Sequence, residues 1–350
     1  MTKPRILLVL LIASALSAHA TIRFVSPSGT APYQTVAAAI AASVNGDTIL
    51  IGPGTYNEGL SFPGLRTVIG AGWDQTTLSG GGLNLNTGGL AGSVVEGISM
   101  VFSAPVFGLG QVDSILIRRC RFQSTGNVSG TLNSNSTRVT FEDCLFVQSA
   151  AYGFVNISIG RTVFRNCLFV HYNGNSNTRY AFSGSNGNLE IYNCVFLGLL
   201  RILNCTGAQP VVFINNVAYD WAGASPSYGT YLAGSMFAYN ASDVITPPGD
   251  SALVLTADPF VNYDEAANYV DGTSDLHPAP GSPLIDSGHP DITDLDSTRS
   301  DRGSYGGPRP FVSFGVPSFP FALTLTATPT LIGVGDTVQV NSSGRVGPRY

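Results

Sequence analysis

The stretch Ile117-Arg118-Arg119-Cys120-Arg121-Phe122 carries the pattern on which the chain is built, because it recurs at nearly constant spacing. Its copies are Phe141-Glu142-Asp143-Cys144-Leu145-Phe146, Phe164-Arg165-Asn166-Cys167-Leu168-Phe169, Ile191-Tyr192-Asn193-Cys194-Val195-Phe196, Ile214-Asn215-Asn216-Val217-Ala218-Tyr219 and, upstream, Val95-Glu96-Gly97-Ile98-Ser99-Met100. Successive copies lie 22, 24, 23, 27 and 23 residues apart. A repeat of this length, made of short apolar pieces separated by Gly- and Asn-rich segments, predicts a β-solenoid.

The copies share a small core-forming residue followed two places later by a large apolar one. In stacked rungs, equivalent positions form a column whose neighbours are about 4.8 Å apart. Cysteine is often fully buried and behaves as a small hydrophobe. We therefore predict a column of buried free thiols, replaced by Ile98 and Val217 at its two ends. The alternative is a disulfide between Cys194 and Cys205, since an exported chain meets an oxidising compartment.

The first twenty residues have the features of a secretory signal peptide. Lys3 and Arg5 are followed by an apolar run over residues 6–16 and by the small-x-small sequence Ala18-His19-Ala20. An uncleaved anchor is the alternative. Beyond this segment the chain has no lysine, fifteen arginines and 22 carboxylates, a formal charge of −7. Nucleic acids and anionic membranes bind clustered positive charge, so the sequence excludes both as expected partners. We expect a monomer that is secreted or held at the cell surface.

The N-terminal part resembles a known family. Residues 33–43 have the apolar stripe of a short amphipathic helix, which predicts a cap for the open end of the solenoid. Thr35-Val36-Ala37-Ala38-Ala39-Ile40, Gly46-Asp47-Thr48-Ile49-Leu50-Ile51 and Gly52-Pro53-Gly54-Thr55-Tyr56 resemble the opening of the pectin-lyase-like superfamily. Together with the rungs, the resemblance covers about residues 22–220. It implies an all-β fold, a single right-handed parallel β-helix of three sheets. The superfamily includes lyases, hydrolases, esterases, epimerases, adhesins and proteins of no known activity, so the fold does not specify a reaction.

The C-terminal part has two further sections. Residues 220–257 lose the period, which indicates a longer excursion or a worn rung. Residues 258–307 hold ten of the 22 carboxylates, with the phrases Pro280-Gly281-Ser282-Pro283-Leu284-Ile285-Asp286-Ser287-Gly288 and Ser304-Tyr305-Gly306-Gly307. This run resembles the end of bacterial choice-of-anchor Q domain proteins, which implies that it closes a β-helix spanning residues 21–310. In the tail, residues 311–350, two strands over 322–340 resemble the start of an immunoglobulin-like or PKD-like module. We expect a poorly ordered end after Asn341.

Candidate catalytic residues lie in the repeats. Pectate-lyase-type catalysis needs an Arg or Lys base and aspartates that bind Ca²⁺, and the missing lysines leave arginine. With Cys120 and Phe122 inward, strand alternation points Arg119 and Arg121 outward and sets Asp143 one rung from Arg119. The alternative for this pair is a surface ion pair of little energetic weight. The motifs of polygalacturonases and pectin methylesterases are absent, and no histidine has a partner spaced for a triad or a Zn²⁺ site.

An acidic cluster gives the one candidate metal site. Asp291, Asp294, Asp296 and Asp301 offer the carboxylate oxygens that Ca²⁺ prefers, although their spacing is not that of an EF-hand loop. The alternative is a solvated acidic turn next to Arg299 and Arg302. No other cofactor is expected.

Two hypotheses for function follow from these patterns. The first is a non-catalytic extracellular or cell-surface protein whose groove and Asn-rich loops, at residues 124–137 and 173–188, contact polysaccharide. The second is a divergent polysaccharide lyase with an arginine base and bound calcium. The missing motifs and the absence of lysine favour the first.

Overall fold

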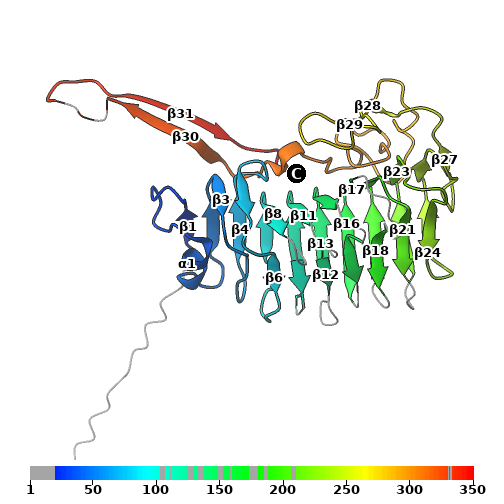
Figure 1. The fold of residues 1–350 in the computed structure, drawn as a ribbon, viewed down its shortest axis with the longest axis horizontal. Coiled ribbons are helices and arrows are strands. Elements are labelled where there is room, and N and C mark those ends of the chain that lie inside the picture. Colours follow the sequence, from blue (N-terminus) through cyan, green and yellow to red (C-terminus); the bar gives the residue numbers. More distant parts are fainter. Residues whose placement is uncertain are drawn as a thin grey trace, which may run out of the picture.

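A computed structural model (Figure 1) describes residues 20–102, 107–110, 112–124, 130–132, 138–148, 153–157, 160–172, 180–184, 188–205, 210–329, 331 and 333–350. The predicted signal peptide and most of the Asn-rich loops lie outside these residues. Within the described part of the chain, no helix has the length and apolar content needed to cross a bilayer.

Three parallel sheets form the solenoid. Sheet A contains β1 (Ile22–Val25), β2 (Thr48–Ile51), β4 (Thr67–Gly70), β7 (Val94–Glu96), β10 (Ile115–Arg118), β13 (Arg138–Glu142), β16 (Arg161–Arg165), β19 (Asn188–Tyr192), β22 (Val211–Ile214) and β25 (Met236–Ala238). Sheet B contains β3 (Gly54–Tyr56), β5 (Thr76–Leu78), β8 (Ser99–Phe102), β11 (Arg121–Ser124), β14 (Leu145–Gln148), β17 (Leu168–His171), β20 (Val195–Leu197), β23 (Val217–Tyr219), β26 (Ala241–Ser242) and β27 (Leu253–Val254). Sheet C contains β6 (Leu83–Leu85), β9 (Phe107–Leu109), β12 (Gly130–Leu132), β15 (Val155–Ile157), β18 (Tyr180–Gly184), β21 (Arg201–Cys205) and β24 (Ser227–Thr230). The sequence prediction of a three-sheet, all-β parallel solenoid is confirmed.

The repeated phrase spans two strands and the turn between them. In the rung that holds Cys120, β10 of sheet A ends at Arg118 and β11 of sheet B begins at Arg121. The chain turns at Arg119, whose φ of 53° lies in the left-handed region. The same conformation recurs at Gly97, Asp143, Asn166, Asn193, Asn215 and Tyr239, which we call the left-handed column. Gly, Asn and Asp adopt this conformation more readily than other residues, which accounts for most of the column's composition.

Two inward columns form the interior. Phe122, Phe146, Phe169 and Phe196 are fully buried, and successive rings stack with centroids 5.2, 4.7 and 4.9 Å apart. All five cysteines lie in the described part of the chain and are free, and those of the column are buried. The predicted thiol column is therefore confirmed, and the alternative disulfide between Cys194 and Cys205 is not formed.

The last copy of the phrase is shifted by one residue from its predicted register. Val217 pairs with Val195 and Ala218 with Phe196, so Asn216 occupies the cysteine position. Asn216 is buried, and its side-chain amide accepts from the Cys194 N–H at 2.8 Å and donates to the Ile191 carbonyl at 3.1 Å. A one-residue slip exchanges the two faces of a strand. The prediction that Val217 fills the cysteine column is therefore wrong, because a hydrogen-bonded asparagine continues it.

The N-terminal cap is shorter than the sequence predicted. Helix α1 spans Val36–Ala41 rather than 33–43, and the Thr35 side chain caps it by accepting from the Ala38 N–H. Glu58 accepts the first two free N–H groups, those of Val36 and Ala37, at 3.0 and 2.9 Å. A side-chain cap and an anion at a helix N-terminus both stabilise a short helix. The buried face of α1 packs against the open end of the core, as expected for a cap.

Residues 220–257 continue the solenoid, contrary to the predicted loss of period. Strands β24, β25, β26 and β27 pair in parallel with the preceding rung or with one another. The solenoid strands end at Val254, before the predicted boundary near residue 310. Residues 256–320, which we call the return segment, run back along the side of the solenoid (Figure 1). Its described strands are the antiparallel pair β28 (Phe260–Asn262) and β29 (Asp275–Pro278).

A second hydrophobic core joins the return segment to the outer face of sheet B. Phe260, Tyr269, Leu276, Leu284 and Phe311 of the return segment are buried there. The other buried residues of this core come from sheet B and from segments next to it, and they are Trp73, Leu145, Val147, Leu168, Val170, Val195, Leu197, Val217, Tyr219, Ala241 and Leu255. The part of sheet B from β14 to β23 is thus buried on both faces, which explains why these strands carry apolar runs, whereas β11 alternates.

The left-handed column holds the return segment one rung at a time, in reverse order along the solenoid. The Asn215 Oδ1 atom accepts from the His289 N–H, and the Asn193 Nδ2 atom donates to the Asp301 carbonyl. The Asn166 Nδ2 atom donates to the Ser304 and Gly306 carbonyls at 2.8 and 2.7 Å. A side chain at Gly306 would clash with the Asp301 carbonyl oxygen, which explains the glycine there.

The tail forms a hairpin that projects beyond the solenoid (Figure 1). Its antiparallel strands are β30 (Phe321–Thr328) and β31 (Gln339–Arg345), after a 3-10 turn, η1 (Ser313–Gly315). Two tail strands form, as predicted, but the second begins at Gln339 and extends beyond the predicted range of 322–340. The expected poorly ordered end after Asn341 is wrong, because the chain returns to the solenoid: the Arg345 guanidinium bonds both Asp74 oxygens at 2.8 Å, and the Pro348 carbonyl accepts from Arg119.

Candidate functional site

The predicted pair of Arg119 and Asp143 forms, but under the tail rather than at the surface. The Arg119 Nε atom lies 3.5 Å from an Asp143 oxygen, and the two side chains are only 3% and 1% exposed. Arg119 also bonds Glu96 at 3.2 Å, the Val316 carbonyl at 3.3 Å and the Pro348 carbonyl at 3.0 Å. The expected outward direction is correct, but the return segment and the tail cover both groups. Arg119 therefore holds the tail and has no open surface toward a substrate.

Asp143 is the least satisfied charged group of this cluster. Neither of its carboxylate oxygens has a hydrogen-bond partner in the described part of the chain. Burial raises its pKa well above the ordinary value, the neighbouring Glu142 adds to the shift, and Arg119 opposes it. A buried carboxylate without donors is costly to ionise, so the fold favours its protonated form.

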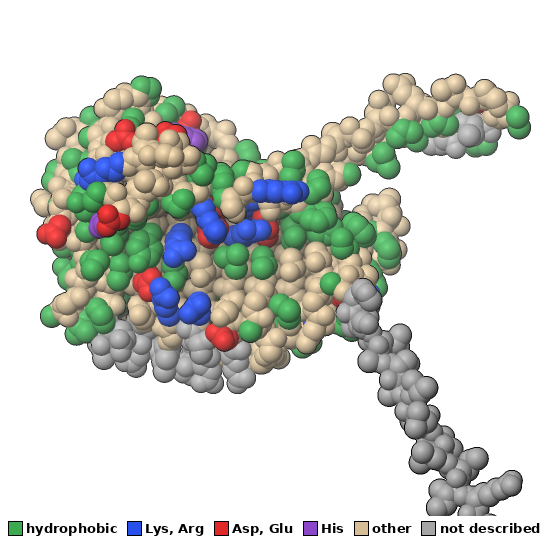
Figure 2. Space-filling model, turned by 180° about the vertical axis from the view of Figure 1, so that it is seen from behind, with side chains coloured by type: hydrophobic (Ala, Val, Ile, Leu, Met, Phe, Trp, Pro, Cys, Tyr) green, Lys and Arg blue, Asp and Glu red, His purple; other side chains and the backbone are tan. Residues whose placement is uncertain are grey.

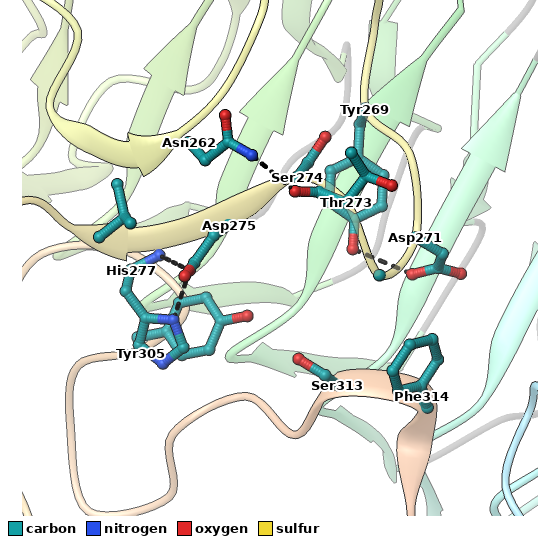
Figure 3. A pocket seen from close by; sticks show the side chains of 12 residues that line it. Asn262, Tyr269, Asp271, Thr273, Ser274, Asp275, His277, Tyr305, Ser313 and Phe314 are labelled. Carbon is teal, nitrogen blue, oxygen red and sulfur yellow. Dashed lines mark hydrogen bonds and ion pairs between the residues drawn. The ribbon is translucent and has the colours of Figure 1, made fainter.

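Arg121, the third candidate, is placed beside a pocket that the sequence did not reveal. Its Nε atom lies 3.6 Å from an Asp271 oxygen, and both side chains are about a quarter exposed. Burial raises the pKa of Asp271, while Arg121 and the Tyr269 hydroxyl lower it. The Tyr269 hydroxyl donates to Asp271 at 3.0 Å and faces its carboxylate in Figure 3.

The pocket lies between the β28–β29 pair and the chain that follows it toward the tail (Figure 3). Its volume is about 480 Å³, within the range of typical small-ligand sites. We call it the aromatic pocket; it is lined by Val261, Asn262, Tyr269, Asp271, Gly272, Thr273, Ser274, Asp275, His277, Tyr305, Ser313 and Phe314. The lining combines aromatic faces with carboxylate, amide and hydroxyl groups, a mixture suited to a ligand with both apolar and hydroxylated surfaces.

One wall of the pocket is a stacked pair of rings. The His277 imidazole lies on the Tyr305 ring with centroids 3.6 Å apart and an angle of 28° between the planes. The Asp275 carboxylate lies 2.6 Å from the His277 Nδ1 atom and accepts from the His277 N–H at 3.0 Å, which fixes the ring's orientation. Partial burial acts to raise the pKa of Asp275, but these two interactions with His277 lower it below its ordinary value. Burial raises the pKa of Tyr305 to about 12, so the phenol is neutral.

The opposite wall carries backbone strain. Phe314 has φ 61° and ψ 7°, a left-handed conformation that is rare for a bulky residue and costs about 1–3 kcal/mol. The Trp73 backbone N–H donates to the Phe314 carbonyl at 2.9 Å, and the Phe314 ring lies so close to Gly272 that a Cβ there would be 2.8 Å from it. The strain places an aromatic ring at the pocket's edge.

Three of the four predicted calcium ligands, Asp294, Asp296 and Asp301, serve as acceptors for turns of the return segment. Asp294 accepts from the N–H groups of Asp301 and Gly307, and Asp296 accepts from the Thr298 N–H and hydroxyl. An Asp301 oxygen accepts from the Asp286 N–H, and Asp291 is 88% exposed. Within the described residues, no three His, Cys, Asp or Glu side chains are grouped closely enough to hold a metal ion. Calcium binding by this cluster stays a prediction.

Sequence reasoning missed the aromatic pocket because its residues come from separated parts of the return segment. Asp275 and His277 stand in the carboxylate-rich section over residues 258–307, but their pairing with Tyr305 depends on how the segment packs on sheet B. A signal was present in the spacing of Asp275 and His277, which lie two apart on one strand and so on one face.

Comparisons with known proteins identify the fold. Neither a family model nor a curated protein sequence matches the chain. Among solved structures it is similar to pectate lyase Pel9A, with a TM-score of 0.56, 15% identity, and coverage of 81% of this chain and 96% of that one. It is also similar to the pectin methylesterase from carrot, with a TM-score of 0.51, 15% identity, and coverage of 67% and 88%. The chain therefore has the right-handed parallel β-helix fold of these proteins, as the sequence resemblance implied.

Proposed function

We propose that this is a secreted or cell-surface β-helix protein that binds extracellular polysaccharide without catalysis, through the aromatic pocket. The observation that carries the proposal is the His277–Tyr305 stack beside the Asp275 and Asp271 carboxylates. A sugar ring presents C–H faces that pack on aromatic rings and hydroxyls that donate to carboxylates, and charged acceptors strengthen such bonds. The fold shared with enzymes named for pectin and pectate supports a saccharide as the ligand class.

The burial of Arg119 supports a binding role over the lyase alternative. A base must reach the substrate proton, and Arg119 is 3% exposed and bonded to Glu96. Arg121 is more open, but it is paired with Asp271. The lyase alternative also needs aspartates that bind Ca²⁺. The described strands of sheet C contain no Asp or Glu, so they supply no carboxylate ligand for such an ion. An assay for unsaturated products on pectate, alginate and chondroitin distinguishes the two functions, and activity lost in Arg121→Ala would establish the enzyme.

The binding test uses the mature chain with cello-, xylo- and galacturonic oligosaccharides in isothermal titration calorimetry. We expect at least one series to bind, and His277→Ala to weaken it about 10-fold through loss of the stacked wall. His289→Ala is the matched control, because His289 lies outside the aromatic pocket, against Tyr239. Absence of binding by all three series, or equal affinities for the wild type and His277→Ala, would contradict the proposal.

A further inference from the structure

A row of alternating charges crosses the outer face of sheet A. Strand register aligns Glu96, Arg118, Glu142, Arg165 and Tyr192 on successive rungs. Neighbours in such a row are about 4.8 Å apart at the backbone, close enough for ion pairs. Arg118 bonds Glu96 at 2.8 Å, as this arrangement predicts. At the start of the row, neighbouring charges of opposite sign are therefore paired.

The compensation stops at Arg165. Its neighbour Glu142 is bonded at 2.9 and 3.1 Å by Arg309, which arrives from the return segment. The next nearby carboxylate, Glu190, is bonded twice by Arg161, at 2.5 and 2.8 Å, and accepts from the Tyr192 hydroxyl at 3.3 Å. Within the described part of the chain, Arg165 forms no ion pair. It is exposed and lies over the Tyr192 ring, with its guanidinium carbon 5.7 Å from the ring centroid.

Arg165 lines a cavity of about 300 Å³, and the guanidinium of a second arginine, Arg309, lines it too. We call it the arginine pocket; it is lined by Arg165, Asn166, Tyr192, Asn193, Ile292, Pro308 and Arg309. The amide N–H groups of Asn166 and Asn193 are donated to the return segment and fix its position. Figure 2 shows arginine and acidic side chains interspersed over the face of the molecule next to the base of the hairpin. A pocket with two arginines and no carboxylate in its lining contrasts with a chain whose formal charge is −5.

We propose that the arginine pocket binds a carboxylate or sulfate group on an acidic glycan, with Arg165 as the anion-binding residue and Tyr192 as a face for the sugar ring. A free guanidinium fork binds carboxylates and tetrahedral oxyanions by paired, charge-assisted hydrogen bonds. Arg309 lines the same pocket, and its charge is balanced by Glu142, so among the described residues of the lining Arg165 is the one that offers an unpaired guanidinium. The inference rests on the proposed function and deepens it, since it assigns the charge class of the polysaccharide and a second binding position.

The experiment compares Arg165→Gln with Arg138→Gln, an exposed arginine of the same sheet that lies outside the pocket. The probes are polygalacturonate oligomers for the carboxylate, dextran sulfate for the sulfate and unmodified dextran as the neutral glycan. We expect Arg165→Gln to weaken binding of one anionic probe about 10-fold, because a charge-assisted hydrogen bond is lost. The probe that responds identifies the anion, and Arg138→Gln should bind as the wild type does.

Two outcomes would overturn the inference. One is equal binding of both anionic probes by Arg165→Gln and Arg138→Gln, and the other is no binding of either probe by the wild type. Failure of the aromatic pocket is distinguishable: if His277→Ala binds oligosaccharides unchanged while Arg165→Gln loses the anionic probe, the arginine pocket stands alone. Circular dichroism and the melting temperature of each variant confirm that the fold is intact.

Discussion

The left-handed column has two halves that do the same structural task with opposite chemistry. In the half made of Asn166, Asn193 and Asn215, neutral amides hold the return segment, and each side chain has hydrogen-bond partners. In the half made of Arg119 and Asp143, the same backbone positions carry buried charges, and Asp143 has no hydrogen-bond donor in the described part of the chain. A neutral amide satisfies a buried carbonyl without the desolvation cost of an ion. The asparagine half therefore stabilises the fold by its own hydrogen bonds. The charged half keeps its position because the surrounding residues pack over it.

The largest effect is expected from removing the positive charge of Arg119, which pairs with Asp143. Arg119→Gln leaves Asp143 without its only ion pair among the described residues and frees the Val316 and Pro348 carbonyls, which should lower the free energy of unfolding by about 3–5 kcal/mol. The double variant Arg119→Gln/Asp143→Asn should recover more than the about 1 kcal/mol that Asp143→Asn is expected to gain in the wild type, because the carboxylate left uncompensated by Arg119→Gln is gone. Urea denaturation of the four proteins of this cycle measures the coupling. Additive effects would show that the two charges do not interact.

A smaller loss is expected in the asparagine half. Asn166→Ala removes two hydrogen bonds to buried carbonyls and places alanine at a φ of 51°, which should cost about 2–3 kcal/mol. Asn166→Gly keeps the backbone conformation and should lose only the hydrogen-bond part of that energy. Asn188→Ala, at an exposed position of β19, is the control. Thermal unfolding that shows Asn166→Ala and Asn188→Ala to be equally stable would remove the structural role of the column.

The smallest effect is expected from Asp143→Asn, which replaces a charged residue of the column by the neutral amide found in the other half. This substitution should stabilise the protein. Because the pKa of Asp143 is raised in the folded protein, folding favours its protonated form. This contribution is fully present below the ordinary carboxyl pKa and is lost as pH rises toward the raised one. Asp143→Asn should therefore stabilise the protein by about 1 kcal/mol at neutral pH and leave it unchanged in acid.

Chemical denaturation at acidic and neutral pH measures this difference. Asp291→Asn, at a side chain that is 88% exposed, is the control. Lower stability of Asp143→Asn at neutral pH would mean that the pairing with Arg119 outweighs desolvation, and the contrast between the two halves would fail.

The sequence by itself determined the solenoid, because its information is local. The spacing of Cys120, Cys144, Cys167 and Cys194 determines the rung length, and the phenylalanines two places later determine the stacked interior. Both follow from which side chains a strand points inward. The register at Asn216 was not readable in this way, since a polar residue in a core column is stable only when backbone groups of the neighbouring rung accept and donate to it.

Only the tertiary structure decided where the candidate sites lie. The return segment contacts the left-handed column across sequence separations that range from 74 residues, between Asn215 and His289, to 140 residues, between Asn166 and Gly306. No local pattern specifies such contacts, because they depend on burying the outer face of sheet B against Phe260, Leu284 and Phe311. That packing covers Arg119, forms the aromatic pocket around His277, and brings Arg309 to Glu142 so that Arg165 is left without a carboxylate partner among the described residues.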